Sequence, residues 1–91
     1  MTVRISLAAV FADRIDGVDV VRLGGRTVGE VLHALTERHP ALAGLVWTAE
    51  GAFNEQLVAF LNRQDVRGLS ALDTPVHSGD ELMLITAIEG G

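Results

Sequence analysis

Thr27-Val28-Gly29-Glu30-Val31-Leu32-His33-Ala34-Leu35 is the stretch around which the rest of the chain can be arranged. Its apolar residues recur at i, i+3, i+4 and i+7, which places them on one face of an α-helix: Val28, Val31, Leu32 and Leu35. Thr27 and Glu30 form a predicted capping box, in which Glu30 accepts a hydrogen bond from the amide of Thr27. His39-Pro40 ends the helix, because the residue before proline disfavours helical angles.

Two extended segments precede this helix. Residues 2–11 alternate between apolar and other side chains and contain β-branched residues, which predicts a strand. Residues 18–23 are also rich in β-branched residues and predict a second strand. Turn-forming Asp and Gly residues lie between them at 13–17. We therefore expect the two strands to form an antiparallel hairpin.

The segment after the helix is less regular. Residues 41–47 predict a short helical turn, and residues 48–51 predict a loop. Leu57 to Leu61 is a continuous apolar run, which is typical of a central strand covered on both faces.

The last third of the chain predicts one short strand and one long one. Residues 62–65 read as a turn, from which the chain returns through Val66 as a short strand. Residues 68–76 are expected to be irregular, and 78–80 to form another turn. Residues 82–88 predict the final strand, followed by a tail at 89–91.

This order of elements predicts an α+β fold with one main helix packed on one face of a mixed sheet. With the first and last strands parallel at the centre of the sheet, the arrangement is a β-grasp, as in ubiquitin. The chain has 91 residues, so we expect one domain at residues 1–88 and a Gly-Gly tail at 89–91.

Composition excludes several classes of protein. The chain has 12 acidic residues, seven arginines, no lysine and a net charge of -5. This charge argues against nucleic-acid binding and suits a partner with a basic docking surface. It has no cysteine, so no disulfide or thiol chemistry is expected. No apolar run approaches a membrane span and no signal peptide is recognisable, which predicts a cytoplasmic protein that does not bind membranes.

Three segments of the second half carry a resemblance to a known family. They are Leu61-Asn62-Arg63-Gln64-Asp65-Val66-Arg67, Leu72-Asp73-Thr74-Pro75 and Ser78-Gly79-Asp80-Glu81-Leu82, and Gly90-Gly91 follows them. Together with the element order they resemble the ubiquitin-like sulfur carriers of the MoaD/ThiS type, and most closely the carrier that feeds sulfide to a cysteine synthase. Two departures are Thr86-Ala87, where prolines are common in the family, and Glu89, where a small residue is common.

The resemblance implies that the working group is the carboxylate of Gly91. An activating enzyme of the ubiquitin-activating class would use ATP to adenylate Gly91, and a sulfur donor would convert the adenylate to a thiocarboxylate. Gly90 and Gly91 lack Cβ atoms and suit a narrow channel in that enzyme. The chain is then a carrier rather than an enzyme, with no bound cofactor of its own.

The identity of the partners stays open at this stage. The sulfur acceptor is a cysteine-synthase-like enzyme or the large subunit of molybdopterin synthase, in which case the chain is the small subunit. A metalloprotease is a further expected partner, if it removes an extension beyond Gly91. The alternative function is a ubiquitin-like modifier that forms amide bonds with other proteins through Gly91.

Strand alternation also predicts a partner-binding surface on the sheet. If Leu82 and Leu84 face the helix, Met83 and Ile85 face the other way, and Val58 and Phe60 join them from the neighbouring strand. We expect these four residues to form an exposed apolar patch. The competing interpretation is that residues 40–56, with Trp47 and Phe53, fold over this face; a register shift of one residue would also exchange the two sets.

The histidines carry no predicted site. His33 and His39 do not share a helix face, and His77 stands alone, so the sequence predicts no metal site.

Overall fold

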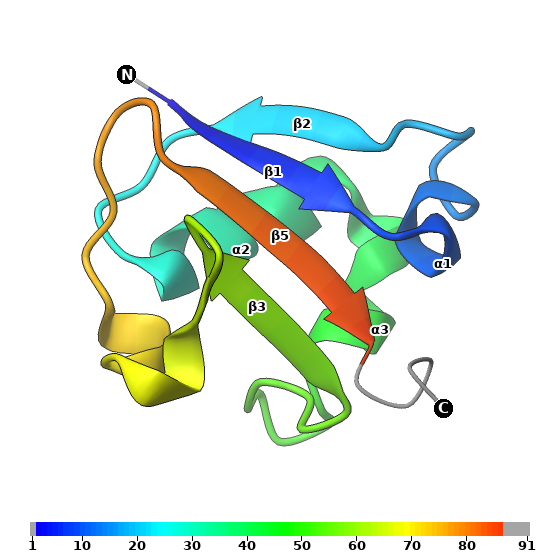
Figure 1. Ribbon diagram of the computed structural model, residues 1–91. Coiled ribbons are helices and arrows are strands. Elements are labelled where there is room, and N and C mark those ends of the chain that lie inside the picture. The colour runs from blue at the N-terminus through cyan, green and yellow to red at the C-terminus, as the bar shows by residue number, and fades with distance from the viewer. Residues whose placement is uncertain (1, 87–91) are drawn as a thin grey trace.

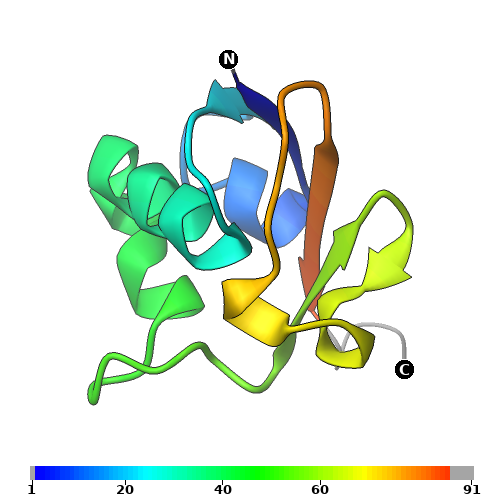
Figure 2. The ribbon, with the colours of Figure 1, turned by 90° about the vertical axis from the view of Figure 1, so that its left-hand side faces the viewer.

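The computed structural model describes residues 2–86 and shows a sheet with helices packed on one of its faces (Figures 1 and 2). The elements follow one another as β1 (Val3–Leu7), α1 (Ala9–Ala12), β2 (Val20–Leu23), α2 (Val28–Arg38), the 3₁₀ helix η1 (Pro40–Leu42), α3 (Ala43–Val46), β3 (Leu57–Leu61), β4 (Gln64–Asp65), the 3₁₀ helices η2 (Val66–Gly68) and η3 (Ala71–Asp73), and β5 (Glu81–Thr86). The expected boundary between domain and tail lies outside the described residues.

The sheet has the topology predicted for a β-grasp. Its strand order is β2-β1-β5-β3-β4. β1 and β5 are parallel, with Ile5 opposite Leu82, and β1 pairs with β2 antiparallel. β3 lies antiparallel to β5, with Ala59 opposite Leu84. The first and last strands therefore meet at the centre, as the element order predicts.

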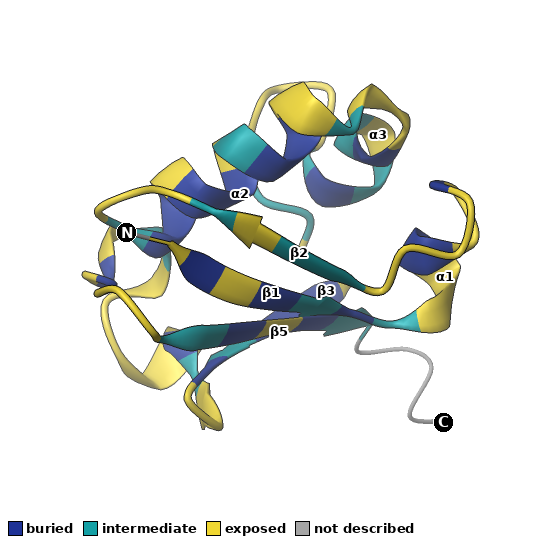
Figure 3. Cartoon of the chain, turned by 90° about the horizontal axis from the view of Figure 1, so that it is seen from above, coloured by how far each residue is buried: buried dark blue, intermediate teal, exposed yellow. Residues whose placement is uncertain are grey.

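The core lies between the sheet and α2. Figure 3 shows the buried side of α2 turned toward the strands and its exposed side turned away. The predicted apolar stripe of the helix is completely buried, as are the facing residues of the central strands: Val28, Val31, Leu32 and Leu35 from α2, and Ile5, Leu82 and Leu84 from the sheet.

The N-terminal cap of α2 differs in one detail from the prediction. The Glu30 amide donates to Thr27 Oγ1 at 3.1 Å, as a capping box requires. The Glu30 carboxylate, however, accepts from the amide of Arg26 at 2.9 Å rather than from that of Thr27. The Glu30 side chain therefore reaches one residue further back than predicted, and its hydrogen bond also holds the turn before the helix.

The prediction that the first strand continues to residue 11 is wrong. β1 ends at Leu7, and α1 follows, with the amide of Ala12 donating to the carbonyl of Ala8 at 3.1 Å. Alanine has the highest helix propensity, and three alanines lie in this short segment. The helical turn brings Phe11 into the core with no exposed surface.

Residues 40–56 pack on the helix side of the sheet and not on its other face (Figure 2). The indole of Trp47 donates to Thr36 Oγ1 on α2 at 3.0 Å, and its ring stacks on His33 with centroids 4.2 Å apart. Phe53 meets Trp47 edge to face. The competing interpretation, in which this segment covers the opposite face, is therefore wrong.

The turn after β3 is shorter than predicted. Asn62 and Arg63, with φ values of 49° and 75°, form the two-residue turn, and Gln64 and Asp65 already pair with β3. Positive φ at both central positions matches the twist of a tight hairpin. Val66, predicted as a strand residue, instead begins η2.

Candidate functional site

β5 carries the chain to the point where the C-terminal segment begins. Leu82 and Leu84 anchor this strand in the core, and β1 and β3 bond to its two edges. The strand ends at Thr86, at the end of the sheet that also carries α1 and α3 (Figure 1). Gly90 and Gly91 lie outside the described residues, so their predicted role is not tested by geometry.

The sheet face opposite α2 carries the predicted partner-binding residues. Met83 is 41% exposed, and Phe60 and Ile85 are half-buried, which agrees with their expected orientation. Val58 is only 6% exposed, so its expected exposure is wrong. A valine on an inner strand extends less far from the sheet than its larger neighbours Phe60 and Ile85.

A shallow hollow on this face has a volume of about 300 Å³ and combines apolar and charged residues: Phe60, Met83, Arg63 and Glu81. The Glu81 carboxylate is held in place from β1. Arg4 Nη1 donates to Glu81 Oε2 at 2.5 Å, and Ser6 Oγ donates to the same oxygen at 3.2 Å. Because the ion pair is about half exposed, it orients the side chains more than it stabilises the fold.

Arginines gather on this sheet face although the whole chain is acidic. Val21 and Leu23 of β2 pack against the core, so the side chain of Arg22 between them points to the opposite face. Three of the seven arginines lie on this side of the sheet, Arg4, Arg22 and Arg63, and Arg4 is paired with Glu81 there. This face therefore carries both signs of charge, arginines together with Glu81.

Asn62, from the segment that carries the family resemblance, joins the β3–β4 turn to the start of β5. Its side-chain amide donates to Asp80 Oδ1 at 3.1 Å, and its side-chain carbonyl accepts from the amide of Glu81 at 3.0 Å. This hydrogen bond from Asn62, with a second from the amide of His77, lowers the pKa of Asp80. The matching residues of the two segments thus hold the register of β5.

Asp65 and Arg67 of the same segment are also paired with each other. Arg67 Nη2 donates to Asp65 Oδ2 at 2.6 Å, and the Arg67 amide donates to Asp65 Oδ1 at 2.9 Å. These bonds lower the pKa of Asp65. Asp65 caps η2 in this way, which is a structural role.

Within residues 2–86, no group of three or more His, Asp or Glu side chains is arranged to hold a metal ion. His33 stacks on Trp47, and His77 lies beside Asp80 with Nδ1 3.8 Å from Oδ2. None of the helices in this part of the chain is long and apolar enough to cross a bilayer.

Comparison with known proteins decides the family. The profile of the ThiS family matches residues 10–91, which is most of the chain and includes its last two glycines. The chain belongs to the ThiS family. The match confirms the resemblance found in the second half of the sequence and extends it to the first half.

Relatives of this ThiS-family chain agree with the assignment. It is 35% identical, over 85 residues that cover 93% of the chain and 91% of the relative, to small archaeal modifier protein 1 of Haloferax volcanii. The crystal structure of that protein, SAMP1, superposes with a TM-score of 0.86 at 30% identity over the full length of both chains. A chain in the Amycolatopsis orientalis BexX/CysO complex gives 0.86 at 26% identity, with coverage of 98% and 99%.

The proteins to which this chain is related are small ubiquitin-like carriers and modifiers rather than catalysts. The ThiS-family chain is therefore a carrier or modifier protein, and not an enzyme. Its β-grasp fold is shared with these relatives along nearly the whole length.

One feature near the end of β5 is absent from the sequence prediction. α1 and the segment around Asn54 enclose a pocket beside Thr86. The sequence signal that would have revealed it is the presence of three alanines among residues 8–12, which favours a helix over the strand expected there.

Proposed function

We propose that the chain is a sulfur carrier whose Gly91 carboxylate is adenylated, converted to a thiocarboxylate and used as a sulfur source in biosynthesis. The observation that carries this proposal is the family match that continues through Gly90 and Gly91. The fold supports it, because β5 is anchored by its neighbours up to Thr86 and the working residues follow only a few positions later. Five residues span at most about 18 Å, enough to enter a partner's active site.

The chemistry has two balanced steps. A carboxylate oxygen of Gly91 attacks the α-phosphorus of ATP, and pyrophosphate leaves, so the inert acid becomes an acyl adenylate. Hydrosulfide then attacks the carbonyl carbon and AMP leaves, which produces the thiocarboxylate. The chain has no cysteine to carry the sulfur, and in this proposal the activating enzyme binds the ATP and catalyses both steps.

The destination of the sulfur is the finer part of the proposal. We assign it to a cysteine-synthase-like acceptor or another enzyme that makes a sulfur-containing metabolite in the cytoplasm. Support comes from the likeness to a chain of the BexX/CysO complex, in which a protein of this fold is bound to another protein. Molybdopterin synthase is the alternative acceptor, and a metalloprotease is the expected partner if Gly91 is first made as part of a longer chain.

The direct test is reconstitution with the activating enzyme of the same genome, ATP and sulfide, followed by intact mass measurement. We expect the mass to increase by the exchange of one oxygen for sulfur, and we expect no increase when ATP is omitted. A chain lacking Gly91 is the control. If the shortened chain gains the same mass, the proposal is wrong.

A second candidate function is a protein modifier, which the 35% identity to a small archaeal modifier protein favours. In this function the Gly91 adenylate is attacked by a lysine amine of another protein. The chain has no lysine, so it cannot form lysine-linked chains of itself. An affinity-tagged chain separates the two functions in cells: a ladder of Gly91-linked adducts supports the modifier, and a free thiocarboxylate without adducts supports the carrier.

A further inference from the structure

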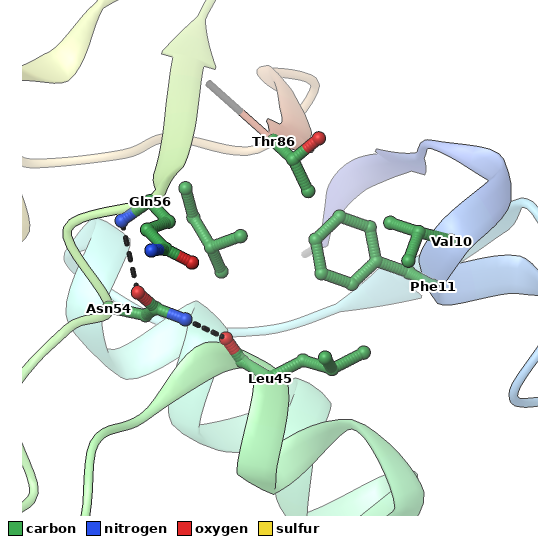
Figure 4. Close-up of a pocket in the computed structure, with 7 residues that line it drawn as sticks. Val10, Phe11, Leu45, Asn54, Gln56 and Thr86 are labelled. Carbon is green, nitrogen blue, oxygen red and sulfur yellow. Dashed lines mark hydrogen bonds between the residues drawn. The ribbon is translucent and has the colours of Figure 1, made fainter. Parts of the chain in front are cut away.

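A pocket of about 320 Å³ opens beside the end of β5, distinct from the hollow on the open sheet face. Figure 4 shows side chains from four separate segments around it. Val10 and Phe11 come from α1, Leu45 comes from α3, Asn54 lies before β3, and Thr86 ends β5. Thr86 turns its methyl group toward the space (Figure 4). The lining is therefore mainly apolar.

The walls of this pocket are held firmly. Phe11 is completely buried and belongs to the core, so one wall is fixed. Asn54 Nδ2 donates to the carbonyl of Leu45 at 3.0 Å, and Asn54 Oδ1 accepts from the amide of Gln56 at 3.0 Å. These bonds tie the loop before β3 to α3 and use the polar atoms of Asn54 internally. A preformed apolar space of this kind suits an apolar guest.

Two acidic residues lie close in sequence to lining residues of the pocket, and we call them its charged rim. Asp13 lies one helical turn beyond Val10, and Glu55 lies between the lining residues Asn54 and Gln56. Both side chains are exposed, so this charged rim is negative.

We propose that this pocket receives an apolar side chain of the activating enzyme, on a segment that also carries basic residues. The inference rests on the proposed function, because Thr86 in the pocket wall is five residues before Gly91, which the enzyme must reach. An apolar anchor surrounded by complementary charge fixes the orientation of a partner and speeds its encounter. Contact here orients the segment that follows Thr86 relative to the active site.

The test measures the Kd for the activating enzyme of two variants that carry the same kind of substitution at different positions. Val10 is 37% exposed at the pocket and Leu69 is 40% exposed near η2, so V10E and L69E introduce the same charge at two similarly exposed sites. We expect V10E to raise Kd by about tenfold or more and L69E to leave it nearly unchanged. A thermal melt of each variant confirms that both are folded.

A second pair of variants tests the charged rim. D13N/E55Q removes two carboxylates at the pocket, and E37Q/D73N removes two exposed carboxylates elsewhere. We expect only D13N/E55Q to weaken binding at low salt and to reduce the dependence of Kd on salt concentration.

Each result bears on one claim. If the wild-type chain is thiocarboxylated through Gly91 but V10E binds as tightly as wild type, the pocket proposal is overturned and the sulfur-carrier function stands. Equal weakening by V10E and L69E overturns it as well, as does a wild-type dimer in sedimentation that V10E dissociates, because a second copy then occupies the pocket. Mass gain by the chain lacking Gly91 contradicts the proposed function instead.

Discussion

At the scale of single residues, Asn62 combines a backbone conformation and a set of hydrogen bonds that few side chains tolerate together. Its φ of 49° lies in the left-handed region, where Asn is enriched, and its side chain binds both Asp80 and Glu81. These combined demands on one side chain give a physical reason why the resemblance to the family is concentrated in the segment around Asn62. The residue holds two turns in register and contributes no chemistry.

We predict that Asn62→Ala lowers the free energy of unfolding by about 1–3 kcal/mol, because it removes both side-chain bonds and disfavours the positive φ. Asn62→Gly removes the same bonds but tolerates the backbone angle, so it should lose less. Urea denaturation measures both, with exposed Gln64→Ala as the control. An Asn62→Ala variant as stable as wild type contradicts the assigned role.

Asp80 gives a prediction about pH. The hydrogen bond from Asn62 and that from the amide of His77 lower the pKa of Asp80 in the folded state below its unfolded value of about 3.9. The stability it contributes is therefore complete above that value and is lost as pH falls through the folded pKa. We predict that the difference in urea midpoint between wild type and Asp80→Asn narrows as pH falls from about 5 to 2. A difference that stays constant over this range would show that ionised Asp80 adds nothing.

At the scale of elements, the sequence predicts α2 and β3 well because each of them has one clear apolar pattern. The stripe of Val28, Val31, Leu32 and Leu35 has the spacing of a helix and no competing period, and all four residues are fully buried. Leu57–Leu61 likewise forms β3 as predicted. Burial of one face decides α2, and burial on both faces along most of β3 decides that strand, so local pattern and tertiary structure agree.

The first strand is predicted less well because its end is decided by tertiary packing. The apolar residues at every second position, Val3, Ile5 and Leu7, are followed by Ala9 and Phe11 at the same spacing. The two-residue period alone therefore predicts a strand that continues to Phe11. Phe11 reaches the core through a helical turn instead, and the same turn makes one wall of the pocket beside Thr86. A pocket assembled from four separate segments cannot be derived from any one of their patterns.

The connection between β2 and α2 gives a prediction at this scale. A Cβ atom on Gly25 would lie 2.7 Å from Cγ2 and 2.9 Å from the amide nitrogen of Val31, so the close approach requires glycine. We predict that Gly25→Ala destabilises the fold by about 1–3 kcal/mol. Gly44→Ala in α3, where nothing lies within 4 Å of the added atom, should leave stability equal or slightly higher. Thermal unfolding of the two variants tests this prediction, and equal melting temperatures would show that the close approach at Gly25 does not limit stability.

At the scale of the whole molecule, two layers leave one sheet face without a helix among residues 2–86 (Figures 1 and 2). The orientation of Phe60, Met83 and Ile85 follows from alternation, whereas the burial of Val58 depends on the sizes of its neighbours.

We predict that the open sheet face also contributes to partner binding. Met83→Glu places a carboxylate in the centre of the apolar surface and should weaken binding to the activating enzyme by about tenfold or more. Val18→Glu changes a residue of similar exposure, 40%, in a loop outside the sheet and serves as the control. Binding titrations of the two variants test this surface, and equal affinities would remove it from the interface.

The central claim is that Gly91 carries sulfur in the cell. The most direct measurement is the intact mass and C-terminal fragment mass of the chain isolated from its own cells under conditions that prevent hydrolysis. The account predicts a fraction of chains ending at Gly91 with one carboxylate oxygen replaced by sulfur, and a larger fraction when the sulfur acceptor is deleted. Chains that carry only an ordinary carboxylate at Gly91, even without the acceptor, would contradict it.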